Sequence, residues 1–163
     1  SGNYKLSYID VLCNVLGLNA INMVQHIKPE GVELTYTSEV DDSFIIHTDQ
    51  NRVEQVLINL LTNAEKYTSR GKIWLHCSLS ENPGMVTFSV TDTGTGVPAE
   101  EAEVIFERFR KLDTFKQGCG LGLNICRIIA TNMGGNVKLD TSYIEGARFV
   151  FTLPIAHNDA AES

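Results

Sequence analysis

The sequence is poor in the features that mark membrane, metal-binding and nucleic-acid-binding proteins. No apolar run is long enough to span a bilayer, and we find no signal peptide at its start. Lys and Arg number 13 against 20 Asp and Glu, and the resulting net charge of −7 argues against nonspecific binding to nucleic acid or to an anionic membrane. We therefore expect a cytoplasmic protein, or the cytosolic part of a membrane-anchored one, that makes no direct membrane contact itself.

Cysteine and histidine patterns are equally sparse. The four cysteines include no C-x-x-C pair and no zinc-finger spacing, and each lies in an apolar or glycine-rich run: Cys13, Cys77, Cys119 and Cys126. This pattern predicts buried free thiols in a reducing compartment. The four histidines are scattered, and we assign none of them to a metal: His26, His47, His76 and His157.

The 163 residues fit one domain with a sizeable core, and they contain no internal repeat and no low-complexity linker. We expect a single domain over residues 1–156 and a frayed tail over 157–163. Strand pairs and helices come in blocks, joined by hairpins rather than by alternating strand and helix. This order predicts an α+β fold, a two-layer sandwich in which a mixed, mostly antiparallel sheet carries helices on one face.

The expected elements follow from hydrophobic periodicity and turn residues. Helices are predicted over 8–27, over 49–67 after a cap at Thr48 or Asp49, over a short stretch within 93–109, and over 121–135. A hairpin with an acidic turn is predicted over 31–49, followed by an antiparallel pair of strands over 72–79 and 85–91. A further strand pair is predicted over 136–142 and 147–154, and residues 110–120 are predicted to be a loop.

The stretch LINLLTNAEKY, residues 57–67, places asparagines inside an amphipathic helix. At about 100° per residue, Asn59, Asn63 and Lys66 form a narrow stripe beside the apolar arc, and Tyr67 lies between the two. Asparagine is a poor helix former, so nothing in helix energetics favours it there. The stripe is either a solvated face or a site, since amide oxygens suit Mg²⁺ and a lysine suits phosphate; spacing alone leaves both open.

Two glycine-rich stretches carry further candidates. SVTDTGTGVP places Asp92 just past a strand, where it is either part of an ordinary turn or an acceptor for an exocyclic amine beside glycines that admit a planar ring. QGCGLGLNIC is a glycine-rich loop entering a helix, an arrangement that suits an anion, although a flexible loop with a packing glycine is the alternative. It is neither a Rossmann fingerprint nor a Walker P-loop.

Taken in order, these segments resemble the ATP-binding catalytic domain of sensor histidine kinases. That domain belongs to the superfamily shared with gyrase, the MutL repair protein and the heat-shock chaperone. NLLTNAEKYTSRG resembles the N box, DTGTGVP the first glycine box, FERFRKLD the F box and GCGLGL the second glycine box, and MGGNVKLDTSYIEGARFVFTLP resembles the closing hairpin. The resemblance covers roughly residues 8–155 and implies a Bergerat-type ATP-binding fold.

The resemblance implies roles for residues at matching positions. Asn63 would be the Mg²⁺ ligand, Asn59 would assist at the metal or the phosphates, Lys66 would contact phosphate, and Tyr67 would flank the adenine. Asp92 would accept from the adenine amino group, with Gly94, Gly96 and Val97 shaping the pocket. Lys111 would reach the γ-phosphate, helped by Arg108 and Arg110. Gly118, Gly120 and Gly122, with the amides of Leu121 and Leu123, would hold the triphosphate, and residues 112–119 would form a mobile lid.

The implied activity is donation of the γ-phosphoryl group of Mg-ATP to a histidine on a separate dimerisation domain. A response regulator receiver domain would be the next partner. None of the four histidines here is followed by an acidic residue, so we expect little self-phosphorylation and a mostly monomeric chain. Cys119 and the sequence GAR depart from the family pattern, but neither removes an implied ligand. The alternatives are a degenerate or regulatory nucleotide-binding module and a non-kinase ATPase. The ATPase would need a water-activating carboxylate where Asn59 stands.

Overall fold

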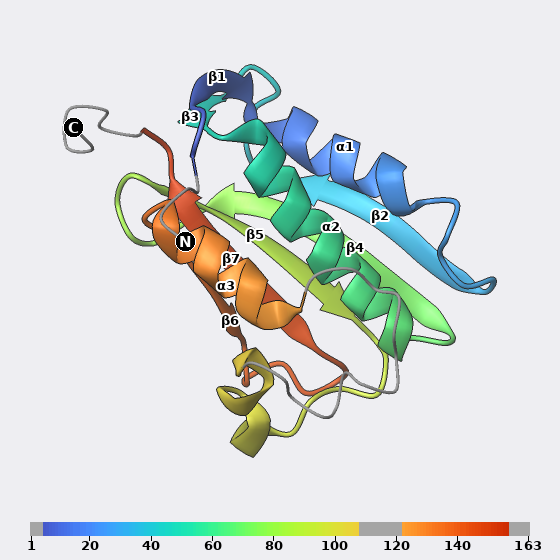
Figure 1. The fold of residues 1–163 in the computed structure, drawn as a ribbon. Coiled ribbons are helices and arrows are strands. Elements are labelled where there is room, and N and C mark those ends of the chain that lie inside the picture. Colours follow the sequence, from blue (N-terminus) through green and yellow to red (C-terminus); the bar gives the residue numbers. More distant parts are fainter. Residues whose placement is uncertain (1–4, 108–121, 157–163) are drawn as a thin grey trace.

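The computed structural model describes residues 5–107 and 122–156. Within these ranges the chain forms two layers, with α1, α2 and α3 packed on one face of a five-stranded sheet (Figure 1). The strand order is β2-β4-β5-β7-β6, in which β2 and β4 run parallel and the other neighbours run antiparallel. The predicted α+β class, with a mixed and mostly antiparallel sheet, is confirmed.

The strands of this sheet are β2 (Val32–Ser38), β4 (Gly71–Leu79), β5 (Met85–Asp92), β6 (Asn136–Leu139) and β7 (Arg148–Pro154). Alternate residues of the central strands are buried beneath the helices, as the period of two in the sequence predicts. Phe88 of β5 and Phe151 of β7 pack with their ring centroids 6.5 Å apart at the centre of this layer. The antiparallel pairs β4–β5 and β6–β7 confirm the two strand pairs predicted over 72–91 and 136–154.

The helices are α1 (Cys13–Val24), α2 (Gln50–Tyr67) and α3 (Leu123–Asn132). Helix α2 begins at a side-chain cap, because Oδ1 of Asp49 accepts a hydrogen bond of 3.1 Å from the backbone N–H of Arg52. It ends at Tyr67, where Thr68 becomes extended. The predicted cap and the predicted end of this helix are both confirmed, and its C-terminal turns reach the site described below. No helix within the described ranges is long and apolar enough to cross a membrane.

The hairpin predicted over 31–49 is wrong. Strand β2 pairs in parallel with β4, after α2 crosses over the sheet, whereas β3 (Ile45–Thr48) pairs antiparallel with β1 (Ile9–Leu12) in a separate two-stranded sheet. The acidic turn between β2 and β3 is anchored elsewhere, because Nδ2 of Asn14 donates to Oδ1 of Asp42 at 2.9 Å. Local alternation predicted both strands but could not tell which strands they would pair with.

Other predicted elements also differ from the structure in extent or in type. The first helix begins at Cys13 rather than Tyr8, because residues 9–12 extend to pair with β3, which leaves Ile9 and Leu12 exposed. The short helix predicted within 93–109 is replaced by two 3-10 turns, Ala99–Glu101 and Val104–Phe106. Cys13, Cys77 and Cys126 are buried free thiols, as predicted. The predicted loop 110–120, the predicted tail 157–163 and Cys119 lie outside the described residues.

Candidate functional site

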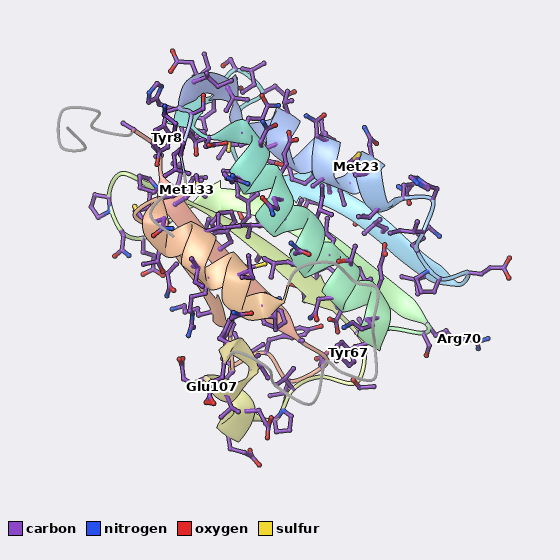
Figure 2. The ribbon with its side chains drawn as sticks, viewed as in Figure 1. Tyr8, Met23, Tyr67, Arg70, Glu107 and Met133 are labelled. Atoms are coloured by element: carbon purple, nitrogen blue, oxygen red, sulfur yellow. The ribbon has the colours of Figure 1, made fainter. Side chains whose placement is uncertain are left out.

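A cavity of about 330 Å³ opens between the C-terminal end of α2, the end of β5 and the 3-10 turns that follow it. Six of its lining residues were predicted as site residues: Asn63, Tyr67, Asp92, Gly96, Val97 and Leu123. Figure 2 shows Tyr67 at the last turn of α2 and Glu107 just beyond the second 3-10 turn, on the two sides of this region. The fold therefore brings residues from the N box, the first glycine box and the start of α3 onto one cavity.

Asp92 is the central polar group of the cavity and is only 3% exposed. Its Oδ1 accepts hydrogen bonds from the backbone N–H groups of Gly94, at 2.8 Å, and Ala147, at 3.1 Å. Burial raises the pKa of Asp92, and these two donors oppose that rise by stabilising the charged form. Both donors use Oδ1, so among the described residues no hydrogen bond reaches Oδ2.

Glycines allow the backbone to approach this carboxylate closely. A Cβ on Gly146 would collide with the carbonyl oxygen of Asp92, and a Cβ on Gly94 would collide with the carbonyl oxygen of Tyr67. Gly94, predicted to shape the pocket, therefore lies against the end of α2 rather than on the cavity lining. The Gly94 contact thus places the segment after β5 against the end of α2, and the Gly146 contact places Asp92 against the segment that leads into β7.

The predicted stripe on α2 divides into a cavity-lining part and a remainder. Asn63 lines the cavity, whereas Asn59, one turn earlier, is 9% exposed and its Nδ2 donates to the carbonyl oxygen of Gln55 at 3.1 Å. Lys66 is half-buried with its Nζ 5.6 Å from the centre of the Tyr67 ring. Of the predicted α2 residues, Asn63 and Tyr67 are thus the ones placed to meet a ligand in this cavity.

The opposite side of the same turns of α2 is buried within the protein. Glu65 is 9% exposed, and its Oε2 is one of the buried side-chain atoms that have no hydrogen-bond partner in the described structure. Burial raises the pKa of Glu65 to about 7, opposed by the charge of Lys28. Thr68, the residue after the helix, is 1% exposed, and its Oγ1 is likewise without a partner. The sequence prediction did not include either residue.

The remaining lining residues were not predicted, and most of them are apolar: Thr95, Pro98, Glu101, Ile105, Ala147 and Phe149. Ile105 and Phe149 resemble ordinary core residues in the sequence, and they reach the cavity only because the second 3-10 turn and β7 meet there. Thr95 and Pro98 lie within the DTGTGVP segment, so an inspection of that whole segment could have found them. Glu101 carries a second carboxylate to the cavity, with no sequence signal of its own.

Several predicted residues cannot be placed. The predicted phosphate-binding residues Lys111, Arg108, Arg110, Gly118, Gly120 and Leu121 lie outside the described ranges, as does the predicted lid over 112–119. Gly122 is described and immediately precedes α3, whose first residue, Leu123, lines the cavity. Within residues 5–107 and 122–156, no group of three or more His, Cys, Asp or Glu is arranged to hold a metal ion.

Comparison with known proteins gives consistent similarities. The family model described as "Histidine kinase-, DNA gyrase B-, and HSP90-like ATPase" matches residues 48–157. The adaptive-response sensory kinase SasA of Nostoc sp. is 41% identical over 145 residues, which make up 86% of this chain and 36% of SasA. The chain thus spans well under half the length of this relative.

Solved structures show the same fold. The catalytic domain of histidine kinase ThkA, in a nucleotide-free form, matches with a TM-score of 0.81 at 26% identity, over 93% of this chain and 97% of that one. Full-length ShkA in complex with AMPPNP also matches with a TM-score of 0.81, at 32% identity, over 97% of this chain and 33% of ShkA. These matches cover nearly the whole of this chain.

Proposed function

Because this chain belongs to the histidine kinase-, DNA gyrase B- and HSP90-like ATPase family, and resembles the catalytic domains of sensor histidine kinases, we propose that it binds Mg-ATP in the cavity beside Asp92. We further propose that it donates the γ-phosphoryl group to a histidine on a separate dimerisation domain. The relatives are sensor histidine kinases, and one solved relative holds an ATP analogue.

The observation that carries the proposal is the placement of Asp92. A desolvated carboxylate with one free oxygen, lying in a cavity lined by Ile105, Leu123 and Phe149, suits a flat heteroaromatic ring with an exocyclic amine. The volume of about 330 Å³ is at the lower end of the range for small-molecule sites. Adenine meets these requirements, whereas guanine would present a carbonyl oxygen where adenine presents its amine.

The metal requirement fits the same residues. Asn63 lines the cavity with an uncharged amide oxygen, a ligand type that Mg²⁺ accepts while it keeps waters and phosphate oxygens. When bound, magnesium would neutralise charge on the triphosphate. Asn59 and Lys66 are proposed to assist from the same helix. Lys111, Arg108 and the glycine-rich segment with Gly118, Gly120, Leu121 and Gly122 are proposed to complete the phosphate site.

The phosphoryl acceptor is proposed to lie on another domain. None of the four histidines of the sequence is followed by an acidic residue, as the acceptor histidine of the resembled family commonly is. The protein's part in transfer is to position the nucleotide and exclude water, and the neighbouring domain supplies the imidazole. We propose that a response regulator follows in the pathway, that the chain is monomeric by itself and acts in the cytoplasm, and that it self-phosphorylates little.

The test is a calorimetric titration of the chain with a non-hydrolysable ATP analogue, with and without Mg²⁺, and with the matching GTP analogue as control. We expect binding of the ATP analogue to tighten with Mg²⁺ and to exceed that of the GTP analogue by about tenfold or more. Absence of binding would overturn the proposal and favour a module that binds only a protein partner. In a separate assay with ATP itself, rapid hydrolysis without transfer to an added dimerisation domain would favour a non-kinase ATPase.

A further inference from the structure

Arg127, on α3, makes three contacts with one guanidinium group, one to β6 and two to the second 3-10 turn and the residue before it. Its Nε donates to the carbonyl oxygen of Val137 in β6 at 3.0 Å, and its Nη1 donates to Oε1 of Glu103 at 2.9 Å. The centre of the guanidinium lies 3.8 Å from the centroid of the Phe106 ring. Helix, edge strand and second 3-10 turn therefore meet at this side chain.

The three contacts differ in strength. The carboxylate of Glu103 is 80% exposed, so its ion pair with Arg127 is screened by water and contributes little. Phe106 is only 6% exposed, and a cation held over a buried ring face is attracted more strongly. The hydrogen bond to Val137 fixes the orientation of the guanidinium plane. A lysine could keep the charge, but it could not donate to Val137 and stack flat on Phe106 at the same time.

The turn that Arg127 contacts forms part of the cavity. Ile105 and Phe149 both line it, and the Phe106 ring packs edge-on against Phe149 with centroids 6.1 Å apart. The turn has little regular structure of its own, since it is a short 3-10 segment closed by bonds such as Phe106 N–H to Glu103 O at 3.1 Å and Glu107 N–H to Val104 O at 3.0 Å. Its position therefore depends on what packs against it, and α3 is the helix that does so.

We propose that Arg127 is a positioning residue for this cavity: it fixes the turn Val104–Phe106 against α3 and so holds Ile105 in place as a wall for the ligand's ring. The inference rests on the proposed function, because the ligand whose affinity it affects is a nucleotide. Arg127 does not touch the nucleotide, since it does not line the cavity. Its effect passes through Phe106 and Ile105.

The first arm of the test uses the chain without nucleotide. Amide hydrogen exchange is compared in Arg127→Lys, in the unmutated chain and in Ile129→Val, which loses one buried methylene from the same helix and keeps Arg127. We expect Arg127→Lys to speed exchange at the Phe106 and Glu107 amides by about tenfold, while the β5 amides stay unchanged. Equal exchange at these two amides in Arg127→Lys and in Ile129→Val would overturn the inference.

The second arm measures affinity for the non-hydrolysable ATP analogue with Mg²⁺, alongside the melting temperature. We expect Arg127→Lys to weaken binding about fivefold, Glu103→Gln less than twofold, and Ile129→Val not at all, even where Ile129→Val lowers the melting temperature as much. Affinity that simply follows the melting temperature across the three variants would overturn the inference and leave the proposed function standing. If the unmutated chain binds no nucleotide, the proposed function itself fails and the inference falls with it.

Discussion

The C-terminal turns of α2 separate two buried carboxylates with opposite surroundings. Asp92, on the cavity side, is 3% exposed, and its Oδ1 accepts from two backbone N–H groups. Glu65, on the other side, is 9% exposed, and its Oε2 has no hydrogen-bond partner in the described structure. Burial raises the pKa of both, but only Asp92 has donors that stabilise its charged form. The two carboxylates are thus equally desolvated in kind, but only Asp92 has backbone donors that oppose the rise in its pKa.

The substitution with the largest expected effect is Asp92→Asn, which removes the carboxylate on the cavity side of α2. Asparagine keeps the shape and can still accept the two backbone N–H groups through its oxygen, but it then turns an NH₂ donor toward the amine of the ligand. We expect affinity for the ATP analogue to fall about 100-fold, or ~2.7 kcal/mol, in a calorimetric titration. Asp140→Asn, which changes a carboxylate outside the cavity, is the matched control, and a loss in Asp92→Asn no larger than in that control would contradict the assignment.

The second substitution, Glu65→Gln, lies on the side of α2 away from the cavity. It should alter the pH dependence of stability rather than nucleotide affinity. The pKa of Glu65 is raised from 4.5 to about 7, so between these two pH values the folded chain binds more protons than the unfolded chain. The contribution of Glu65 to stability is therefore fully present below pH 4.5 and is lost as the pH rises through about 7. Glu65→Gln should remove this dependence and exceed the unmutated chain in stability by about 2 kcal/mol at pH 8.

Urea unfolding at several pH values between 5 and 8 measures this effect. Glu33→Gln, at an exposed position of β2, serves as the control and should leave the pH profile of the unmutated chain intact. If Glu65→Gln and Glu33→Gln gave parallel profiles, Glu65 would not be the group responsible for the dependence.

A third pair of variants sharpens the comparison along α2 itself. Asn63 lines the cavity while Asn59 bonds to its own helix, so Asn63→Ala should weaken Mg²⁺-dependent binding about tenfold and Asn59→Ala should weaken it less. Without Mg²⁺ the two variants should bind the nucleotide analogue alike. A larger Mg²⁺-dependent loss in Asn59→Ala would move the proposed metal ligand one turn toward the start of the helix.

The smallest expected effect is that of Thr68→Val. The Oγ1 of Thr68 is buried and has no hydrogen-bond partner among the described residues, and valine has nearly the same shape without the hydroxyl. We expect stability to rise by about 0.5–1 kcal/mol in urea unfolding at pH 7, with nucleotide affinity unchanged. A loss of stability would show that the Thr68 hydroxyl is hydrogen-bonded in solution. Thr62→Val is the control: its Oγ1 donates to the carbonyl oxygen of Asn59, so this substitution should lower stability.

The sequence predicted best what depends on near neighbours. Helix α2 could be bounded at both ends because its cap at Asp49 and its apolar arc are local, and the pairs β4–β5 and β6–β7 could be matched because short turns join them. The partners of β2 and β3 could not be predicted, because both are distant in sequence. Strand β2 pairs with β4, which follows α2, and β3 pairs with residues 9–12. Periodicity contains no information about such distant pairing.

The same division holds for the site. The placement of Asn63 and Asp92 on the cavity could be predicted from local patterns. Asn63 is an asparagine inside a helix, and Asp92 is a carboxylate just before a glycine-rich turn. Ile105 and Phe149 could not be distinguished from core residues, and Ala147 acts through its backbone N–H, which no side-chain pattern reveals. The buried Glu65 was missed because a glutamate in a helix ordinarily lies at the surface.

The pairing of β5 with β7 determines when the sheet can be completed during synthesis of the chain. Residues 85–91 pair with residues 148–154, which are synthesised much later. A chain growing from its N-terminus therefore exposes one edge of β5 until β7 has been made. The second N–H donor to Asp92 comes from Ala147, immediately before that late strand. The hydrogen bonds of Asp92 are therefore complete only when β7 docks, and we expect a chain truncated before β7 to lack the finished form of the proposed nucleotide site.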